Sequence, residues 1–182
     1  MPIQTEVPSE LSERLVGGVN LKPGTLGDQL DPDAVHLLVF LRHLGCIFCR
    51  ETIADLRDCC ADDPNFPLPL FFFQGSSTEG RALLRGLWPQ ARAVADASGE
   101  FYDAFGVGRA GLVAMFRPAV WSARSRAQGK GHEQGRRTGD IWRMPGMFLT
   151  HGREILWAHD YSHAADHPDY RTVREHAARR VV

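Results

Sequence analysis

The chain has 182 residues, which is enough for one domain with a substantial hydrophobic core. Its 43% hydrophobic and 24% charged residues are ordinary for a globular protein, and the net charge of −1 argues against a nucleic-acid or membrane-surface partner. No run approaches the roughly 18 apolar residues of a membrane helix. The polar N-terminus lacks the basic and apolar regions of a secretory signal, so we expect a cytoplasmic protein.

Strands and helices alternate in the first half of the chain. Residues 9–16 predict a short helix, and the Pro- and Gly-containing stretch Leu21–Val35 predicts a loop. Val35–Leu41 is an apolar run broken only by His36, which is typical of a strand covered on both faces. From Cys46 to Cys60 the apolar spacing becomes helical.

The alternation continues to the C-terminus. We expect, in order, a strand at Leu68–Gly75, a helix at Ser77–Trp88 with Thr78 as a possible N-cap, a strand at Arg92–Asp96, a short helix at Gly99–Val107, a hairpin of Met147–Leu149 with Ile155–Ala158, and a terminal helix at Asp169–Arg180. This order predicts an α/β, thioredoxin-like fold, a central mixed sheet flanked by helices. We expect one domain over 1–182, with an N-terminal extension at 1–34 and a basic insertion at 106–139.

A Cys-x-x-Cys pair, Cys46 and Cys49, lies where the first strand gives way to a helix, after the turn residue Gly45. The unpaired N–H groups and the dipole of a helix N-terminus favour a thiolate there. This placement predicts a redox pair in which Cys46 attacks and Cys49 resolves. Zinc binding and two merely buried thiols are the alternatives.

Zinc binding would require a second pair of ligands, and Cys59–Cys60 is the candidate. On a continuous helix, a rise of about 1.5 Å per residue puts Cys59 roughly 20 Å from Cys46. That distance exceeds any common zinc coordination shell, so we expect Cys60 in the core and Cys59 at the helix end.

The segment "FLRHLGCIFCRE" around the pair resembles the active-site segment of peroxiredoxin-like proteins of the AhpC/TSA group, in the selenoprotein L-like and prostamide synthase-like branch. Ala158–Pro168, "AHDYSHAADHP", is similar to a segment near the C-terminus of bacterial members. The resemblance implies a thioredoxin fold and a redox-active Cys46–Cys49 pair. It also implies that Pro145, directly before an apolar strand, occupies the position of a cis-proline that faces the disulfide and positions substrate.

The chain departs from typical peroxiredoxins at two positions. Those proteins carry a Pro seven residues and a Thr three residues before the attacking Cys, where this chain has Val39 and His43. Those proteins also carry an Arg that orients the peroxide, near the strand that follows the cis-proline position. By the resemblance, Pro145 occupies that position here. Arg42 or His43 could substitute electrostatically as a substrate-positioning residue, and His43 could equally be a structural, hydrogen-bonded side chain.

Residues 106–139 contain seven basic side chains and one acidic side chain, Glu133, a net charge of +6 against −7 elsewhere. Within them, Gly111–Trp121 is apolar enough to form a helix, and Ser125–Gly139 reads as a mobile loop. A basic loop could steer anionic substrates or contact RNA, but a solvated insertion is the simpler interpretation.

Three histidines, His159, His163 and His167, recur every fourth residue with Asp166 beside them. One helix face would make them a metal site. Because Pro168 follows at once, we expect instead a turn, with Asp166 or Asp169 capping the last helix, and no metal.

These features together predict a thiol–disulfide oxidoreductase of the peroxiredoxin-like type. The alternatives are a thiol peroxidase that reduces hydroperoxides or endoperoxides and a redox-inert binding module. We expect a thioredoxin- or glutathione-type electron donor and a peroxide or disulfide substrate. No organic cofactor is expected, because the chain has no Gly-rich phosphate-binding loop.

Overall fold

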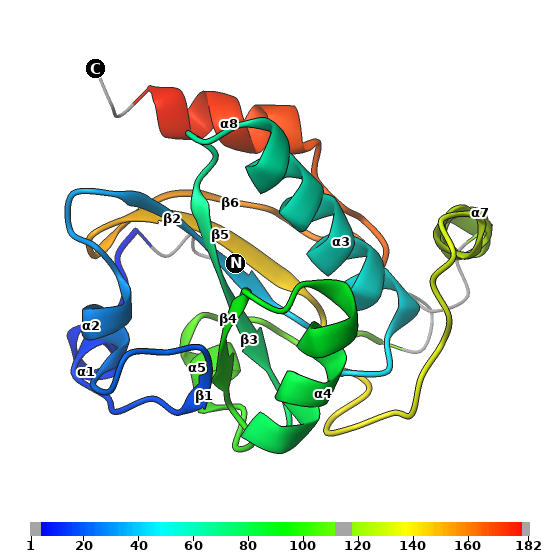
Figure 1. Cartoon of the computed structure of the whole chain (residues 1–182), viewed down its shortest axis with the longest axis horizontal. Helices are drawn as coiled ribbons and strands as arrows, with labels where there is room; N and C mark the ends of the chain where they lie inside the picture. The colour runs from blue at the N-terminus through cyan, green and yellow to red at the C-terminus, as the bar shows by residue number, and fades with distance from the viewer. Residues whose placement is uncertain (1–4, 112–117, 180–182) are drawn as a thin grey trace.

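The computed structural model describes residues 5–111 and 118–179. A six-stranded mixed sheet, in the order β1-β4-β3-β2-β5-β6, runs through its centre (Figure 1). β2, β3 and β4 are parallel, and β5, β6 and β1 are antiparallel to their neighbours. The strands are β1 (Gly18–Val19), β2 (Val35–Phe40), β3 (Leu68–Phe73), β4 (Arg92–Ala95), β5 (Gly146–His151) and β6 (Glu154–Ala158).

Helices cover both faces of this sheet, as the apolar run of β2 predicts. Alternate β2 residues, Leu37 and Val39, pack in one core cluster, whereas Leu38 and Phe40 pack in the other. The helices are α1 (Ser9–Ser12), α2 (Leu26–Gln29), α3 (Ile47–Asp62), α4 (Ser77–Leu87), α5 (Glu100–Ala104), α7 (Pro118–Gly129) and α8 (Tyr170–Ala178).

The expected elements are present, and the predicted thioredoxin-like fold is confirmed. Two details differ, and one open choice is resolved. Leu21–Val35 is not entirely a loop, because Thr25 and Asp28 form a capping box that starts α2. The N-cap of α4 is Ser76, whose hydroxyl accepts from Glu79 N, rather than Thr78. The last helix is capped by Asp169, one of the two candidates.

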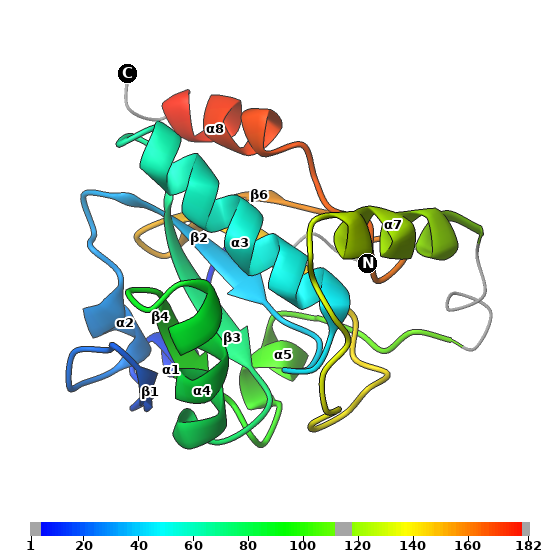
Figure 2. The same ribbon diagram turned by 45° about the vertical axis from the view of Figure 1, so that its right-hand side comes forward.

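The basic insertion also differs from its prediction as a mobile loop. The first residues of the predicted loop, Ser125–Gly129, belong to α7, which lies beside α3 (Figure 2). The predicted helix at Gly111–Trp121 falls largely on residues 112–117, outside the described residues. The described part of the insertion is anchored to α3 by ion pairs of Arg126 and Lys130 with Glu51.

None of the described helices is both long and apolar enough to cross a membrane.

Candidate functional site

The Cys46–Cys49 pair lies at the N-terminal end of α3, directly after the turn that follows β2. Cys46 is the N-cap residue of α3, and Cys49 lies in its first turn. Both are free thiols, and both are buried, with exposed fractions of 2% and 4%. The helix is continuous to Asp62, which keeps Cys59 and Cys60 at its far end, half-buried against the core.

The structure shifts the pKa values of the two thiols in opposite directions. A hydrogen bond from Cys49 and the charge of Arg42 lower the pKa of Cys46 to about 6, against the opposing effect of burial. The backbone N–H groups of Cys49 and Phe48 add smaller contributions. Burial and the neighbouring Cys46 raise the pKa of Cys49 well above its ordinary value. The first thiol is therefore the better nucleophile at neutral pH.

Arg42 provides the positive charge at this site. Its side chain is only 7% exposed, and its Nη1 lies 3.7 Å from Cys46 Sγ. Two backbone carbonyls fix the guanidinium, since Nε donates to Arg143 O at 2.9 Å and Nη2 donates to Ile141 O at 2.8 Å. The backbone N–H of Arg42 also donates to Cys49 Sγ at 3.2 Å. One residue thus contacts both thiols.

His43 is buried, and burial together with the charges of Arg42 and Arg137 lowers its pKa to about 4. The imidazole is therefore neutral at pH 7 and supplies no positive charge to Cys46. Of the two residues proposed from the sequence to replace the usual thiolate-stabilising groups, the geometry favours Arg42.

Pro145 directly precedes β5, and its peptide bond with Met144 is trans. The cis form implied by the resemblance is therefore not the one present. The segment before Pro145 still lies beside the thiols, because Arg42 binds the carbonyl oxygens of Ile141 and Arg143. Whether Pro145 positions a substrate stays a prediction.

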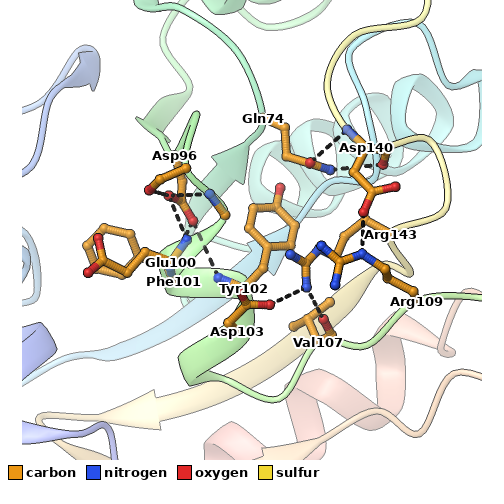
Figure 3. Close-up of polar contacts among 12 residues, drawn as sticks. Gln74, Asp96, Glu100, Phe101, Tyr102, Asp103, Val107, Arg109, Asp140 and Arg143 are labelled. Carbon is orange, nitrogen blue, oxygen red and sulfur yellow. Dashed lines mark hydrogen bonds and ion pairs between the residues drawn. The ribbon is translucent and has the colours of Figure 1, made fainter.

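Gln74, which sequence reasoning missed, holds the turn that carries Arg42. Its buried side-chain amide donates to Arg42 O. The same amide donates to Asp140 O, and its Oε1 accepts from Asp140 N at 3.0 Å (Figure 3). Asp140 in turn pairs with Arg109. A polar residue at the carboxyl end of a buried strand was the available signal, because such strand ends commonly meet at a site.

Arg143 and Tyr102 support the same region from the other side of the sheet. Arg143, 3% exposed, pairs with Asp103 at 2.6 Å and lies over the Tyr102 ring (Figure 3). The fully buried Tyr102 hydroxyl contacts the carbonyl oxygens of Leu41 and Phe72, at the ends of β2 and β3. These contacts fix the strand ends from which the Cys46 turn emerges.

Glu51 is the most unexpected residue near the pair. Its side chain is 0% exposed, and Arg126 binds both carboxylate oxygens at 2.8 and 3.0 Å. Lys130 lies 3.1 Å away. The contrast between a net charge of +6 in the insertion and −7 elsewhere was the signal for such pairing, although it does not identify the acidic partner.

The three histidines of the C-terminal segment make separate contacts. His159 Nε2 lies 2.9 Å from Asp166 O, His163 Nδ1 accepts from the backbone, and His167 lies 3.3 Å from Thr52 Oγ1. Across residues 5–111 and 118–179, no group of three or more His, Cys, Asp or Glu side chains is placed to hold a metal ion.

Solved structures share the fold at low sequence identity. A peroxiredoxin-like protein from Aquifex aeolicus matches with a TM-score of 0.64 and 10% identity, covering 98% of this chain and 87% of that one. Peroxiredoxin 5 from Alvinella pompejana matches with a TM-score of 0.60 and 14% identity, covering 98% and 99%. A secreted Mycobacterium tuberculosis disulfide oxidoreductase homologous to Escherichia coli DsbE matches with 0.56 and 11%, covering 94% and 99%.

Sequence comparison is more specific about ancestry than these structures are. No curated protein sequence matches the chain. The family described as AhpC/TSA antioxidant enzyme matches residues 62–163, which is more than half of the chain but begins after Cys46 and Cys49. The selenoprotein L-like branch is not tested by these matches. With this match and a thioredoxin-like sheet, the chain belongs to the AhpC/TSA antioxidant enzyme family.

Proposed function

We propose that this protein is a thiol–disulfide oxidoreductase in which Cys46 attacks and Cys49 resolves. The proposal is carried by the contrast between the two thiols. The hydrogen bond from Cys49 and the charge of Arg42, 3.7 Å away, lower the pKa of Cys46, whereas burial and the neighbouring Cys46 raise the pKa of Cys49. With a pKa of about 6, Cys46 is mostly thiolate at pH 7, and the thiolate is the reactive form.

The exchange proceeds in two steps. The Cys46 thiolate attacks one sulfur of a substrate disulfide, and the other sulfur leaves as a thiolate. Cys49 then passes its proton to a departing thiolate and attacks Cys46 Sγ, which closes the Cys46–Cys49 disulfide and frees the substrate. Two electrons pass from the pair to the substrate, and a thioredoxin- or glutathione-type donor returns them.

Arg42 acts as a fixed charge before the first step and again when the pair is re-reduced. It stabilises the Cys46 thiolate before attack, and it stabilises the same sulfur when a second donor thiol displaces Cys46 from a donor–Cys46 mixed disulfide. Because two backbone carbonyls hold the guanidinium, the charge is in place before the substrate arrives.

A thiol peroxidase is the second candidate, and membership of the AhpC/TSA family favours it. The Cys46 thiolate would attack a hydroperoxide oxygen and release an alcohol or water, leaving a sulfenic acid. Cys49 would condense with that sulfenic acid and release water. Val39 and His43 replace the usual Pro and Thr, so we expect peroxide reduction to be slower than in typical peroxiredoxins.

Single cysteine variants test the proposal, with Cys59→Ser as the matched control at the far end of the same helix. Cys46→Ser should abolish disulfide reduction, and Cys49→Ser should accumulate mixed disulfides visible as mass adducts on Cys46. Cys59→Ser should behave as wild type. Full activity in both Cys46→Ser and Cys49→Ser would leave the pair a structural feature and favour a redox-inert binding module. A peroxide-consumption assay on the same variants separates the two enzymatic candidates.

A further inference from the structure

The basic insertion packs on the turn directly before the reactive pair. Residues 134–138, here named the covering segment, pack on Gly45, the residue before Cys46. In Figure 2 the insertion runs from α7 past the N-terminal end of α3. Gly135 N donates to Gly45 O at 2.9 Å, and the Gln134 side chain donates to the same oxygen. Leu44 N donates to Thr138 Oγ1 at 3.1 Å. Cys46 is only 2% exposed, so a substrate reaches its sulfur only if the residues around it move, and the covering segment lies on the residue directly before it.

Ion pairs hold the insertion in that position. The buried Glu51 carboxylate on α3 pairs with Arg126 on α7 and with Lys130, four residues before the covering segment. Lys130 also pairs with Asp55 at 2.8 Å. Lifting the insertion would separate Glu51 from both cations and leave it beside the neutral His167, 3.8 Å away, and a carboxylate with no exposed surface depends on charged partners.

The backbone beside the thiols is also occupied. Residues 142–144 form backbone hydrogen bonds with residues 108–110. Arg42 binds the carbonyl of Arg143 within this segment and that of Ile141 just before it. Ala110 N donates to Trp142 O at 2.7 Å, and Met144 N donates to Gly108 O at 2.9 Å. An extended peptide substrate commonly docks by adding a strand to free backbone groups of this kind. Here the insertion itself has taken them.

We propose that Glu51 is a specificity-determining residue, which holds the covering segment over Cys46 so that small disulfides or hydroperoxides react and protein-bound disulfides do not. The identity of the chemistry rests on the proposed function, whereas access to Cys46 can be measured without it. Small molecules need only a local opening beside Gly45, but a protein disulfide needs the covering segment and residues 108–110 displaced together.

The strength of the anchor sets the size of the expected effect. The Arg126 and Lys130 side chains are 46% and 42% exposed, so solvent screens their charges and weakens the two ion pairs. The Glu51 side chain has no exposed surface, so its own charge is screened less. We therefore expect loss of the ion pairs to raise the fraction of molecules with an open covering segment about tenfold, which is equivalent to about 1.4 kcal/mol. This value lies between the contributions of fully exposed and of fully buried ion pairs to stability.

The test is the rate of Cys46 alkylation by iodoacetamide and by a polymer-linked iodoacetamide, followed by peptide mass spectrometry across pH. The plateau rate at high pH reports access, and the midpoint reports the Cys46 pKa, so the two effects separate. We expect the bulky reagent to react far more slowly than the small one in wild type. Glu51→Gln and Arg126→Gln should raise the bulky plateau about tenfold without moving the midpoint.

Arg124→Gln is the matched control, because Arg124 is exposed on α7 and makes no ion pair within the described part of the chain. A second variant displaces the covering segment by a steric clash and leaves the ion pairs of Glu51 intact. A Cβ at Gly45 would lie 2.2 Å from Arg136 O, so Gly45→Ala must displace the covering segment. Gly86→Ala, where nothing lies within 4 Å, is its control.

Equal plateau rates for the two reagents in wild type would overturn the inference. So would bulky plateaus that stay at the wild-type value in both Glu51→Gln and Gly45→Ala. If wild type reduces a protein disulfide as fast as a small one, the inference fails while the proposed function stands. If the plateaus change as expected but no variant reduces any disulfide, the proposed function fails while control of access by Glu51 stands.

Discussion

Replacing Arg42 should raise the pKa of Cys46 more than any other single substitution outside the cysteines. Arg42→Met keeps the buried apolar stem and removes the charge. At a separation of 3.7 Å, opposite unit charges attract by about 4.5 kcal/mol at an effective dielectric constant of about 20. At about 1.36 kcal/mol per pKa unit, this corresponds to roughly 3 units as an upper bound.

Relaxation and water penetration after the substitution will recover part of that energy. We therefore expect the Cys46 midpoint to rise by about 1–3 units from its value of about 6. The assay is the alkylation rate of Cys46 against pH, read by peptide mass spectrometry, with circular dichroism to verify folding. Arg42→Lys retains a charge and should shift the midpoint less.

His43→Ala is the critical comparison, because His43 follows Arg42 in the turn before Cys46 and is neutral at pH 7. It should leave the midpoint close to wild type. An unchanged midpoint in Arg42→Met, or an equal rise in His43→Ala, would refute the assignment of the positive charge to Arg42.

Three further predictions concern the surrounding structure. Burial opposes ionisation of Glu51, but hydrogen bonds from Arg126 and Lys130 outweigh it and lower the pKa below its ordinary value. A lowered folded-state pKa gives stability that is present above about pH 4.3 and is lost as pH falls through the folded pKa, so acid should destabilise wild type more than Glu51→Gln in urea unfolding. Tyr102→Phe should lower the free energy of unfolding by about 1–3 kcal/mol, since Leu41 O loses a buried donor; equal urea midpoints would show that the hydroxyl is dispensable. Ser76→Ala should cost about 1 kcal/mol by the same assay through loss of the α4 capping box, while Thr78→Ala should be nearly neutral; the reverse order would restore Thr78 as the cap.

The sheet and the position of the cysteine pair could be predicted because their signals are local. The apolar run of β2, the helical spacing after Cys46 and the hairpin near Gly152 each depend on neighbours in the sequence. The capping box of α2, Thr25 with Asp28, was an equally local signal that the Pro and Gly residues around it obscured.

The surroundings of the site could not be predicted, because they depend on contacts between distant residues. Glu51 and Arg126 are 75 residues apart, and Gln74 binds Asp140 across 66. Sequence spacing gives no information on which basic side chain of an insertion folds back onto which helix. From the sequence the insertion is therefore interpreted as a solvated loop, although it packs on the turn before the thiols and on α3.

The central claim is that Cys46 and Cys49 form the redox pair, and thiol mapping after oxidation tests it most directly. The protein is treated with a stoichiometric amount of hydrogen peroxide or of a small disulfide, its remaining thiols are alkylated, and its peptides are identified by mass spectrometry. We predict a Cys46–Cys49 disulfide that a dithiol reverses, with Cys59 and Cys60 still alkylated. A disulfide joining Cys46 to Cys59 or Cys60, or full alkylation of both Cys46 and Cys49 after oxidation, would contradict the account.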